Sequence, residues 1–378
     1  MDLALYSNKP EFIVVYGRRR IGKTYLIREY FNNKFSFYTS GTEDKSSKYQ
    51  LSVFASKLSK YSGEDIINLK SWLEAFTILE KYIEEGKIKK DETSKKYVLF
   101  FDEIPWLDTQ KSDFTSAFDL FWNTFLSARS DVLLIVSGSA SSWIIKNFID
   151  DTGGFYNRIT QKIHLMPFSI KETNELYDYY GIKINELELI QSYMIFGGVP
   201  YYISLMDKRY SLIQNTEMLV FEEDGELFKE LNSLYDSLFK KSKIHINIAR
   251  TLAKSEQSLT REDISKKALI GSGKPLSNAL RELEECGFIR KYNNITTTKN
   301  NAFYQLIDPF SLFSFKFVES GKITSWIKYS NSPSYYSWQG HAFEVVCFHH
   351  IEEIKRLLKV EGIEANIYSW RSKINNHL

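Results

Sequence analysis

The feature of the sequence that most constrains the fold is a segment of the form G-x4-G-K-[ST], GRRRIGKT at residues 17–24. It follows FIVVY at 12–16, a short apolar run rich in β-branched residues, which predicts a buried parallel strand. The next segment, TYLIREYF, has the apolar period of a helix. In such a loop, successive backbone N–H groups and the helix N-terminus form a cradle for an anion. The setting between strand and helix therefore predicts a phosphate-binding loop.

Each position of this loop has an expected task. The glycines permit backbone angles and close approaches that side chains would block. Lys23 is expected to reach the β- and γ-phosphates of a nucleotide, and the Thr24 hydroxyl to complete the shell of a Mg2+ ion. The three arginines could contact a phosphate or a partner, although such basic clusters are more often solvated. The predicted nucleotide-binding residues are Gly17, Arg18, Arg19, Arg20, Ile21, Gly22, Lys23, Thr24 and Tyr25.

A second element is an apolar strand that ends in two adjacent acids, Asp102 and Glu103, within YVLFFDEIPWL. Downstream of a phosphate-binding loop, the first acid is expected to hold Mg2+ and the second to polarise the attacking water. The predicted metal residues are thus Thr24 and Asp102, and Lys23 and Glu103 are assigned to catalysis. The glutamate favours hydrolysis over phosphoryl transfer to another substrate, because it provides a base for water.

Three further residues are catalytic candidates. Ser137 and Ser139 end the apolar run at 132–136, where a polar residue could sense the γ-phosphate; a plain turn is the alternative. Arg158 precedes the next apolar run and could neutralise charge in the transition state, in cis or from a neighbouring subunit. A structural salt bridge is the alternative for Arg158.

Apolar runs alternate with helical stretches up to about Phe168, which predicts an α/β fold. We expect a three-layer P-loop NTPase core with a parallel sheet at 1–168 and a helical lid at 169–239. Helical stretches at 244–254, 260–267 and 275–286, followed by a hairpin, indicate a winged helix-turn-helix at 240–310. The last region, 311–378, carries aromatic clusters and an amphipathic helix expected at 341–358.

Charge and cysteine content restrict the compartment and the partners. The chain has 378 residues, a net charge of +2 and two cysteines, which favour a reducing compartment without a disulfide framework. It has no signal peptide and no apolar run of about 18 residues, so we expect a cytoplasmic protein without a membrane span. The basic charge is local: residues 240–310 hold thirteen Lys and Arg against seven Asp and Glu, a charge of +6.

This basic region could bind duplex DNA. Ser272, Lys274 and Asn278 begin the candidate recognition helix, where helix-turn-helix proteins place base contacts, and Lys291 lies near the wing. Three acids later in the same helix would repel DNA, and winged helices also bind proteins. Both partners therefore stay open; the opposing acids are Glu282, Glu284 and Glu285.

Several motifs together resemble the archaeal-type ATPase family, within the AAA-like and STAND division of P-loop NTPases. They are EFIVVYGRRRIGKTYLI, VLFFDEIPWL, VSGSASS, the HLMPF that ends at Phe168, and GGVPYY from Gly197. The resemblance implies ATP as ligand, and an ATPase core joined to a helical lid, a winged helix and often a nuclease-like C-terminal region. The family's Phe-x-Gly-Arg-Glu box is absent, so adenine specificity rests on the resemblance alone.

The C-terminal region departs from the family pattern. Glu344, in GHAFE, resembles a metal-binding glutamate of the nuclease-like fold, but the remaining carboxylates should follow Trp370, and the sequence ends at Leu378. Cleavage with two metal ions needs several carboxylates. We therefore expect a truncated remnant without nuclease activity.

The sequence as a whole predicts an ATPase that hydrolyses ATP with Mg2+ and couples nucleotide state to its winged helix. The alternative is a nucleotide-dependent regulator or protein-interaction switch with little turnover. A small-molecule kinase is disfavoured by the Asp-Glu pair and by the additional domains. Oligomerisation is left open.

Overall fold

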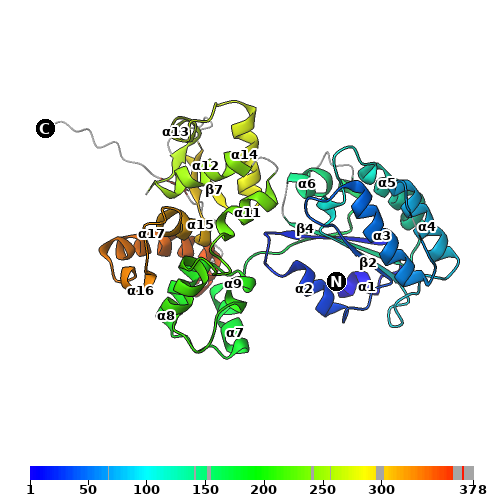
Figure 1. The fold of residues 1–378 in the computed structure, drawn as a ribbon, viewed down its shortest axis with the longest axis horizontal. Coiled ribbons are helices and arrows are strands. Elements are labelled where there is room, and N and C mark those ends of the chain that lie inside the picture. The colour runs from blue at the N-terminus through cyan, green and yellow to red at the C-terminus, as the bar shows by residue number, and fades with distance from the viewer. Residues whose placement is uncertain are drawn as a thin grey trace. The chain divides into compact units, whose positions relative to one another are not determined.

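The structure is a computed structural model, and contacts between Cα atoms divide it into two units, Met1–Met166 and Pro167–Leu378 (Figure 1). The expected strand after Trp370 and most of the Asn/Thr-rich turn lie outside the described residues. Those residues are 1–66, 68–139, 142–150, 155–239, 242–255, 257–294, 302–360 and 368–369.

The first unit is built on a five-stranded sheet of order β2-β3-β4-β1-β5, in which every neighbouring pair is parallel. This confirms the predicted α/β fold with a parallel sheet. The carboxyl ends of all five strands meet at one edge, and the chain order reverses beside β1, where open α/β sheets bind their ligands. The strands are β1 (Glu11–Gly17), β2 (Phe37–Ser40), β3 (Tyr97–Asp102), β4 (Val132–Ser139) and β5 (Gln161–His164).

Helices cover both faces of this sheet (Figure 1). Alternate residues of β1, β3 and β4 enter two cores, one containing Phe101 and Val136 and the other containing Phe100 and Ile135. Because both of their faces are buried, these three strands read as nearly continuous apolar runs. The α-helices are α1 (Asp2–Leu5), α2 (Lys23–Tyr30), α3 (Ser47–Ser62), α4 (Trp72–Glu84), α5 (Phe114–Leu120) and α6 (Ser142–Ile144).

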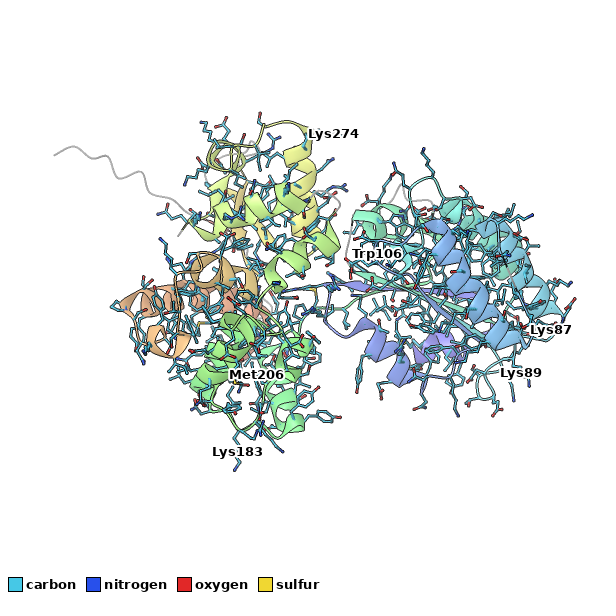
Figure 2. The ribbon with its side chains drawn as sticks, viewed as in Figure 1. Lys87, Lys89, Trp106, Lys183, Met206 and Lys274 are labelled. Atoms are coloured by element: carbon cyan, nitrogen blue, oxygen red, sulfur yellow. The ribbon has the colours of Figure 1, made fainter. Side chains whose placement is uncertain are left out.

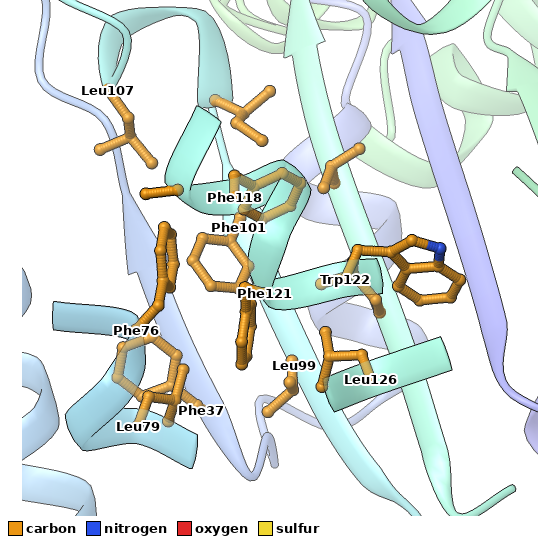
Figure 3. Close-up of a cluster of buried hydrophobic side chains, with 14 of the residues drawn as sticks. Phe37, Phe76, Leu79, Leu99, Phe101, Leu107, Phe118, Phe121, Trp122 and Leu126 are labelled. Atoms are coloured by element: carbon orange, nitrogen blue, oxygen red, sulfur yellow. The ribbon is translucent and has the colours of Figure 1, made fainter. Parts of the chain in front are cut away.

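The larger core is strongly aromatic. Phe76 of α4 and Phe121, at the end of α5, stack with ring centroids 5.0 Å apart, and Phe118 meets Phe101 of β3 edge to face (Figure 3). Short 3-10 and π-helical turns continue or connect the main elements. They span Ile104–Trp106, Phe121–Phe125, Leu126–Ala128, Ile145–Ile149 and Tyr156–Arg158.

The second unit begins with five helices. Three of them, α7, α8 and α10, begin at a capping box, in which the N-cap and N3 side chains each accept a hydrogen bond from the other residue's backbone N–H. Nearby residues in the sequence therefore determine where these three helices begin. A π-helical turn spans Glu217–Phe221. The helices are α7 (Ile170–Tyr180), α8 (Glu186–Phe196), α9 (Pro200–Ser204), α10 (Leu212–Thr216) and α11 (Glu230–Leu238).

The helices and the hairpin expected within residues 240–310 follow in the predicted order. Three helices within a few residues of the predicted bounds precede an antiparallel hairpin, in which Arg290 pairs with Gln305. A short strand between the first two helices joins the same sheet. The elements are α12 (Ser242–Ala253), β6 (Leu259–Thr260), α13 (Arg261–Lys267), α14 (Lys274–Glu285), β7 (Ile289–Asn294) and β8 (Phe303–Leu306).

The helix expected at 341–358 is wrong in its bounds. It begins at Pro333, whose fixed φ suits the first helical position, and breaks after His349, where His350 leaves helical geometry. The following elements complete the chain: α15 (Pro309–Phe313), a π-helical turn (Ser314–Val318), α16 (Trp326–Tyr329), α17 (Pro333–His349), α18 (Ile351–Leu357) and β9 (Tyr368–Ser369).

The expected lid and the C-terminal region share one hydrophobic core. Tyr202 of α9 packs against Phe310 of α15, with ring centroids 4.9 Å apart, and Phe221 stacks on Trp326 at 5.1 Å. The same cluster takes in Trp338 of α17. Many of the C-terminal aromatic residues are therefore core residues; they include Phe313, Phe317, Trp326, Tyr335 and Trp338.

Candidate nucleotide-binding site

The loop after β1 has the backbone that its glycines permit. Gly17 has φ of 152°, and a Cβ there would lie 2.2 Å from the carbonyl oxygen of Leu165. Gly22 has φ of 90° and is the N-cap of α2. Ile21 is 2% exposed and anchors the loop in the core. These two glycines are therefore needed for two different reasons, close packing at Gly17 and left-handed geometry at Gly22.

Lys23 is folded back into this loop. Its ammonium group donates to the carbonyl oxygens of Gly17 at 3.3 Å and Arg18 at 3.0 Å. Burial lowers the pKa of Lys23, while the nearby Glu103 and Asp102 act in the opposite direction. The ammonium group of Lys23 thus lies at the loop, close to Asp102 at the end of β3 and to Glu103, which follows it.

Thr24, Asp102 and Ser137 meet at the carboxyl edge of the sheet. The Thr24 hydroxyl lies 3.0 Å from Oδ1 and 2.9 Å from Oδ2 of Asp102, and Ser137 donates to Oδ1. The cause is sheet register: Phe101 pairs with Val136, so the next residues face each other on the side that α2 covers. Three elements distant in sequence thereby place their polar side chains together.

Glu103 lies beside this cluster in left-handed geometry, with φ of 46°. The backbone N–H of Ser139 donates to its Oε2 at 3.3 Å, and the Ser139 hydroxyl to its Oε1 at 3.4 Å. Both serines at the end of β4 therefore contact the acids of β3.

The donor set fits Mg2+. A hydroxyl and one carboxylate converge beside an anion cradle, and Mg2+ usually takes one or two carboxylates together with substrate phosphates and water. Within the described ranges, no group of three or more His, Cys, Asp and Glu side chains is placed to hold a metal ion.

The arginine candidates differ in their surroundings. Arg18 is only 7% exposed, so the expectation of a solvated side chain is wrong for it, whereas Arg19 forms a 3.6 Å ion pair with Glu43. Arg20 has φ of 70°. Tyr25, on α2, is 65% exposed.

Arg158 pairs with Asp119 of α5 and lies over the ring of Phe155. The structure thus contains the salt bridge that the sequence offered as the alternative to a catalytic role.

Sequence reasoning missed two residues at the site. Nη2 of Arg28 donates to the Tyr38 hydroxyl at 2.6 Å, and that hydroxyl lies 3.5 Å from Oδ2 of Asp102. Arg28 follows Thr24 by one helical turn and so shares its face, which is a signal that the sequence did contain. Nothing in the sequence pattern placed Tyr38.

Two motifs of the second unit interlock. The backbone N–H of Phe168 donates to the carbonyl oxygen of Gly198 at 2.7 Å, and the Tyr193 hydroxyl donates to the carbonyl oxygen of Phe168 at 2.9 Å. A Cβ on Gly198 would lie 1.8 Å from that same oxygen. The Gly-Gly-Val-Pro segment therefore packs directly on the Pro-Phe segment.

Residues 3–206, more than half of the chain, match the family described as an ATPase domain predominantly from Archaea. The chain belongs to this family. The matched region contains the whole loop, Asp102 and Glu103, and both serines of β4.

Individual relatives are distant. An uncharacterized protein of Methanocaldococcus jannaschii is 25% identical over 319 residues, which cover 83% of this chain and 65% of that protein. The chain thus spans 65% of the length of that relative.

Solved structures share the fold. A Walker-type ATPase of Pyrococcus abyssi superposes with a TM-score of 0.56 at 17% identity, covering 82% of this chain and 92% of its own. The ORC2 protein of Aeropyrum pernix, in ADPNP–ADP complexes, gives 0.50 at 12% identity, covering 85% and 90%. In the described part of this chain, no helix is both long and apolar enough to cross a membrane.

Proposed function

We propose that the chain binds Mg-ATP at residues 17–25 and hydrolyses it with Glu103 as the base for water. The observation that carries this proposal is the meeting of Thr24, Asp102 and Ser137 beside the anion cradle, with Glu103 as the next residue of the chain. The family's ATPase description and the ADPNP–ADP complexes of the A. pernix protein support a nucleotide as the ligand.

Each residue has a role in this proposal. Lys23 would move from the loop carbonyls to the β- and γ-phosphates. Thr24 and Asp102 would hold Mg2+, which when bound supplies positive charge that neutralises the phosphates. Ser137 orients Asp102. The Glu103 carboxylate would first leave Ser139 and then accept a proton from the attacking water.

We further propose that nucleotide state is coupled to the winged-helix region, which contacts duplex DNA. The charge of +6 on residues 240–310 supports phosphate contacts. Lys274 begins α14 (Figure 2), and the exposed residues of its first two turns include Ser277, Asn278 and Arg281. This surface is basic and polar, as an interface with DNA requires.

The orientation of Glu282 also supports DNA contact. Its Oε2 lies 2.8 Å from Nε2 of His245, whose side chain is 5% exposed. Glu285 lies 3.5 Å from Arg281 on the same helix. Two of the three acids that oppose DNA binding thus have partners within the winged helix, while Glu284 stays exposed.

A second candidate is a nucleotide-dependent switch of the AAA-like and STAND type with little turnover, acting through a protein partner. The contact between Glu103 and Ser139 favours it, because the base is held by two donors. In this proposal the region 311–378 corresponds to the family's nuclease-like C-terminal region.

Turnover measurements distinguish the two candidates. ATP hydrolysis by the full chain would be measured with and without duplex DNA, alongside molecular mass in each nucleotide state. Hydrolysis that DNA stimulates supports the first candidate. Tight Mg-ATP binding without turnover, with or without DNA, would exclude it and favour the switch.

A further inference from the structure

A polar connection runs from α2 through β2 to the acid at the end of β3. Arg28 donates to the Tyr38 hydroxyl at 2.6 Å, and its guanidinium carbon lies 4.9 Å from the centre of the Tyr38 ring. The Tyr38 hydroxyl lies 3.5 Å from Oδ2 of Asp102, which is longer than an ordinary O–H···O hydrogen bond.

Tyr38 is held in this place by packing. It pairs with Phe100 across β2 and β3, and their ring centroids are 5.3 Å apart. Phe35 lies against both rings, at 5.8 Å from Tyr38 and 5.3 Å from Phe100. Asp102 follows two residues after Phe100 on the same face, where a long side chain on the neighbouring strand can reach it diagonally.

Which group donates in the Arg28–Tyr38–Asp102 connection follows from the chemistry of the three side chains. Arg28 can only donate, so it uses the Tyr38 oxygen as an acceptor and leaves the hydroxyl proton for another group. Asp102 is the carboxylate within reach.

Asp102 depends on these donors differently with and without a cation. In this structure Thr24 is the nearest donor to Oδ2, at 2.9 Å. Under the proposed function, Thr24 turns its hydroxyl to the cation, and Oδ2 loses that donor. Tyr38 then remains to fix Oδ2, while Ser137 fixes Oδ1.

The geometry points to Tyr38 as a positioning residue for Asp102, oriented by Arg28, that sets the Mg2+ requirement of nucleotide binding. This inference rests on the proposed function. Outer-shell partners of metal ligands typically contribute about 10- to 100-fold to metal affinity or activity. Neither residue touches the nucleotide or the reacting atoms in this proposal.

The test is a Mg2+ titration of the full chain with fluorescent ATP analogue, read as binding, in the wild type and in Tyr38→Phe. We expect Tyr38→Phe to raise the half-saturating Mg2+ concentration about tenfold, the lower end of the outer-shell range. Affinity in EDTA should not change, and saturating Mg2+ should restore turnover, because the phenylalanine ring keeps the packing. Tyr30→Phe is the matched control. Tyr30 lies on α2, as Arg28 does, but its hydroxyl donates to Asp2 and not to Asp102.

A double-variant cycle separates positioning from simple packing. Because Arg28 acts through the Tyr38 hydroxyl, adding Arg28→Gln to Tyr38→Phe should shift the Mg2+ requirement no further. An unchanged Mg2+ requirement in Tyr38→Phe, or an equal loss of affinity in EDTA, would overturn the inference and leave the proposed function standing. A wild-type chain that binds no nucleotide under either condition would overturn both.

Discussion

Ser139 holds the carboxylate of Glu103 with its backbone N–H at 3.3 Å and its hydroxyl at 3.4 Å. Glu103 directly follows Asp102, the last residue of β3, and Ser139 is the last residue of the neighbouring β4, so both lie at the carboxyl edge of the sheet. Both distances are long for hydrogen bonds, and the Glu103 side chain can therefore leave Ser139 at small cost. Glu103 therefore lies beside the anion cradle, and its release from Ser139 is the step on which turnover depends.

Glu103→Gln should bind Mg-ATP as the wild type does and hydrolyse it about 100- to 10,000-fold more slowly, which is the usual contribution of a general base. The amide keeps the size of the side chain and loses its basicity. Steady-state phosphate release and nucleotide affinity, measured on the same preparation, check the prediction. Glu92→Gln, in an exposed loop, is the control. Full turnover by Glu103→Gln would remove this residue from the mechanism.

Lys23→Ala should lose most nucleotide affinity, because the cradle loses the only lysine of the loop. In the wild type this ammonium group is already at the loop, bound to the carbonyl oxygens of Gly17 and Arg18. Equilibrium binding of labelled ATP measures the loss, with Lys48→Ala on an exposed face of α3 as control. Unchanged binding by Lys23→Ala would mean that nucleotide binds elsewhere.

The parallel sheet and the loop after β1 could be predicted from the sequence because their signals are local. Each buried strand is a continuous apolar run, and Asp102 and Glu103 end one of them. Tyr38 could not be predicted, because its position depends on β2 lying beside β3, a pairing between segments about sixty residues apart. The burial of Arg18 likewise depends on surroundings that a basic cluster does not reveal.

Sequence reasoning also failed to foresee the shared core of the second unit. Tyr202 and Phe310 are more than a hundred residues apart and belong to regions that were expected to be separate. Their aromatic character predicted burial but not the partner. The orientation of Glu282 depends in the same way on where α12 places His245.

Gly198→Ala should destabilise the chain by about 1–3 kcal/mol, the usual cost of overpacking. Its Cβ would lie 1.8 Å from the carbonyl oxygen of Phe168, a backbone atom that cannot simply turn away. Gly340→Ala is the matched control, because a Cβ on that residue of α17 meets nothing within 4 Å. It should stabilise the helix by about 0.5–1 kcal/mol. Thermal unfolding of both variants checks that one change lowers stability and the other raises it. Equal unfolding midpoints for the two variants would contradict the packing argument.

The chain should show no metal-dependent nuclease activity. Glu344 lies on α17 with its side chain 58% exposed, and its Oε2 lies 3.9 Å from Nδ1 of His341. Cleavage through two metal ions needs several carboxylates around them. Incubation of plasmid DNA with the chain and Mg2+ or Mn2+ tests this. Cleavage by the wild type that disappears in Glu344→Ala would show the prediction to be wrong.

The last prediction concerns DNA binding by residues 240–310. With about four to six phosphate contacts, the slope of log affinity against log salt should be roughly −4 to −5. Lys274→Ala should weaken binding to all sequences alike and flatten this slope by about one unit, because the exposed Lys274 ammonium at the start of α14 would contact a phosphate. Asn278→Ala, on the exposed face of the same helix, should instead change sequence preference.

The acids of α14 should behave differently from one another. Glu284→Gln should strengthen DNA binding, because it removes an exposed negative charge. Glu282→Gln should instead lower thermal stability, because only Glu282 is paired with the buried His245. Titration of the full chain with duplexes of different sequence, from low to higher salt, measures the slope and the Lys274, Asn278 and Glu284 variants, and thermal unfolding measures Glu282→Gln. No binding at micromolar concentration would exclude DNA and leave α14 as a surface for a protein partner.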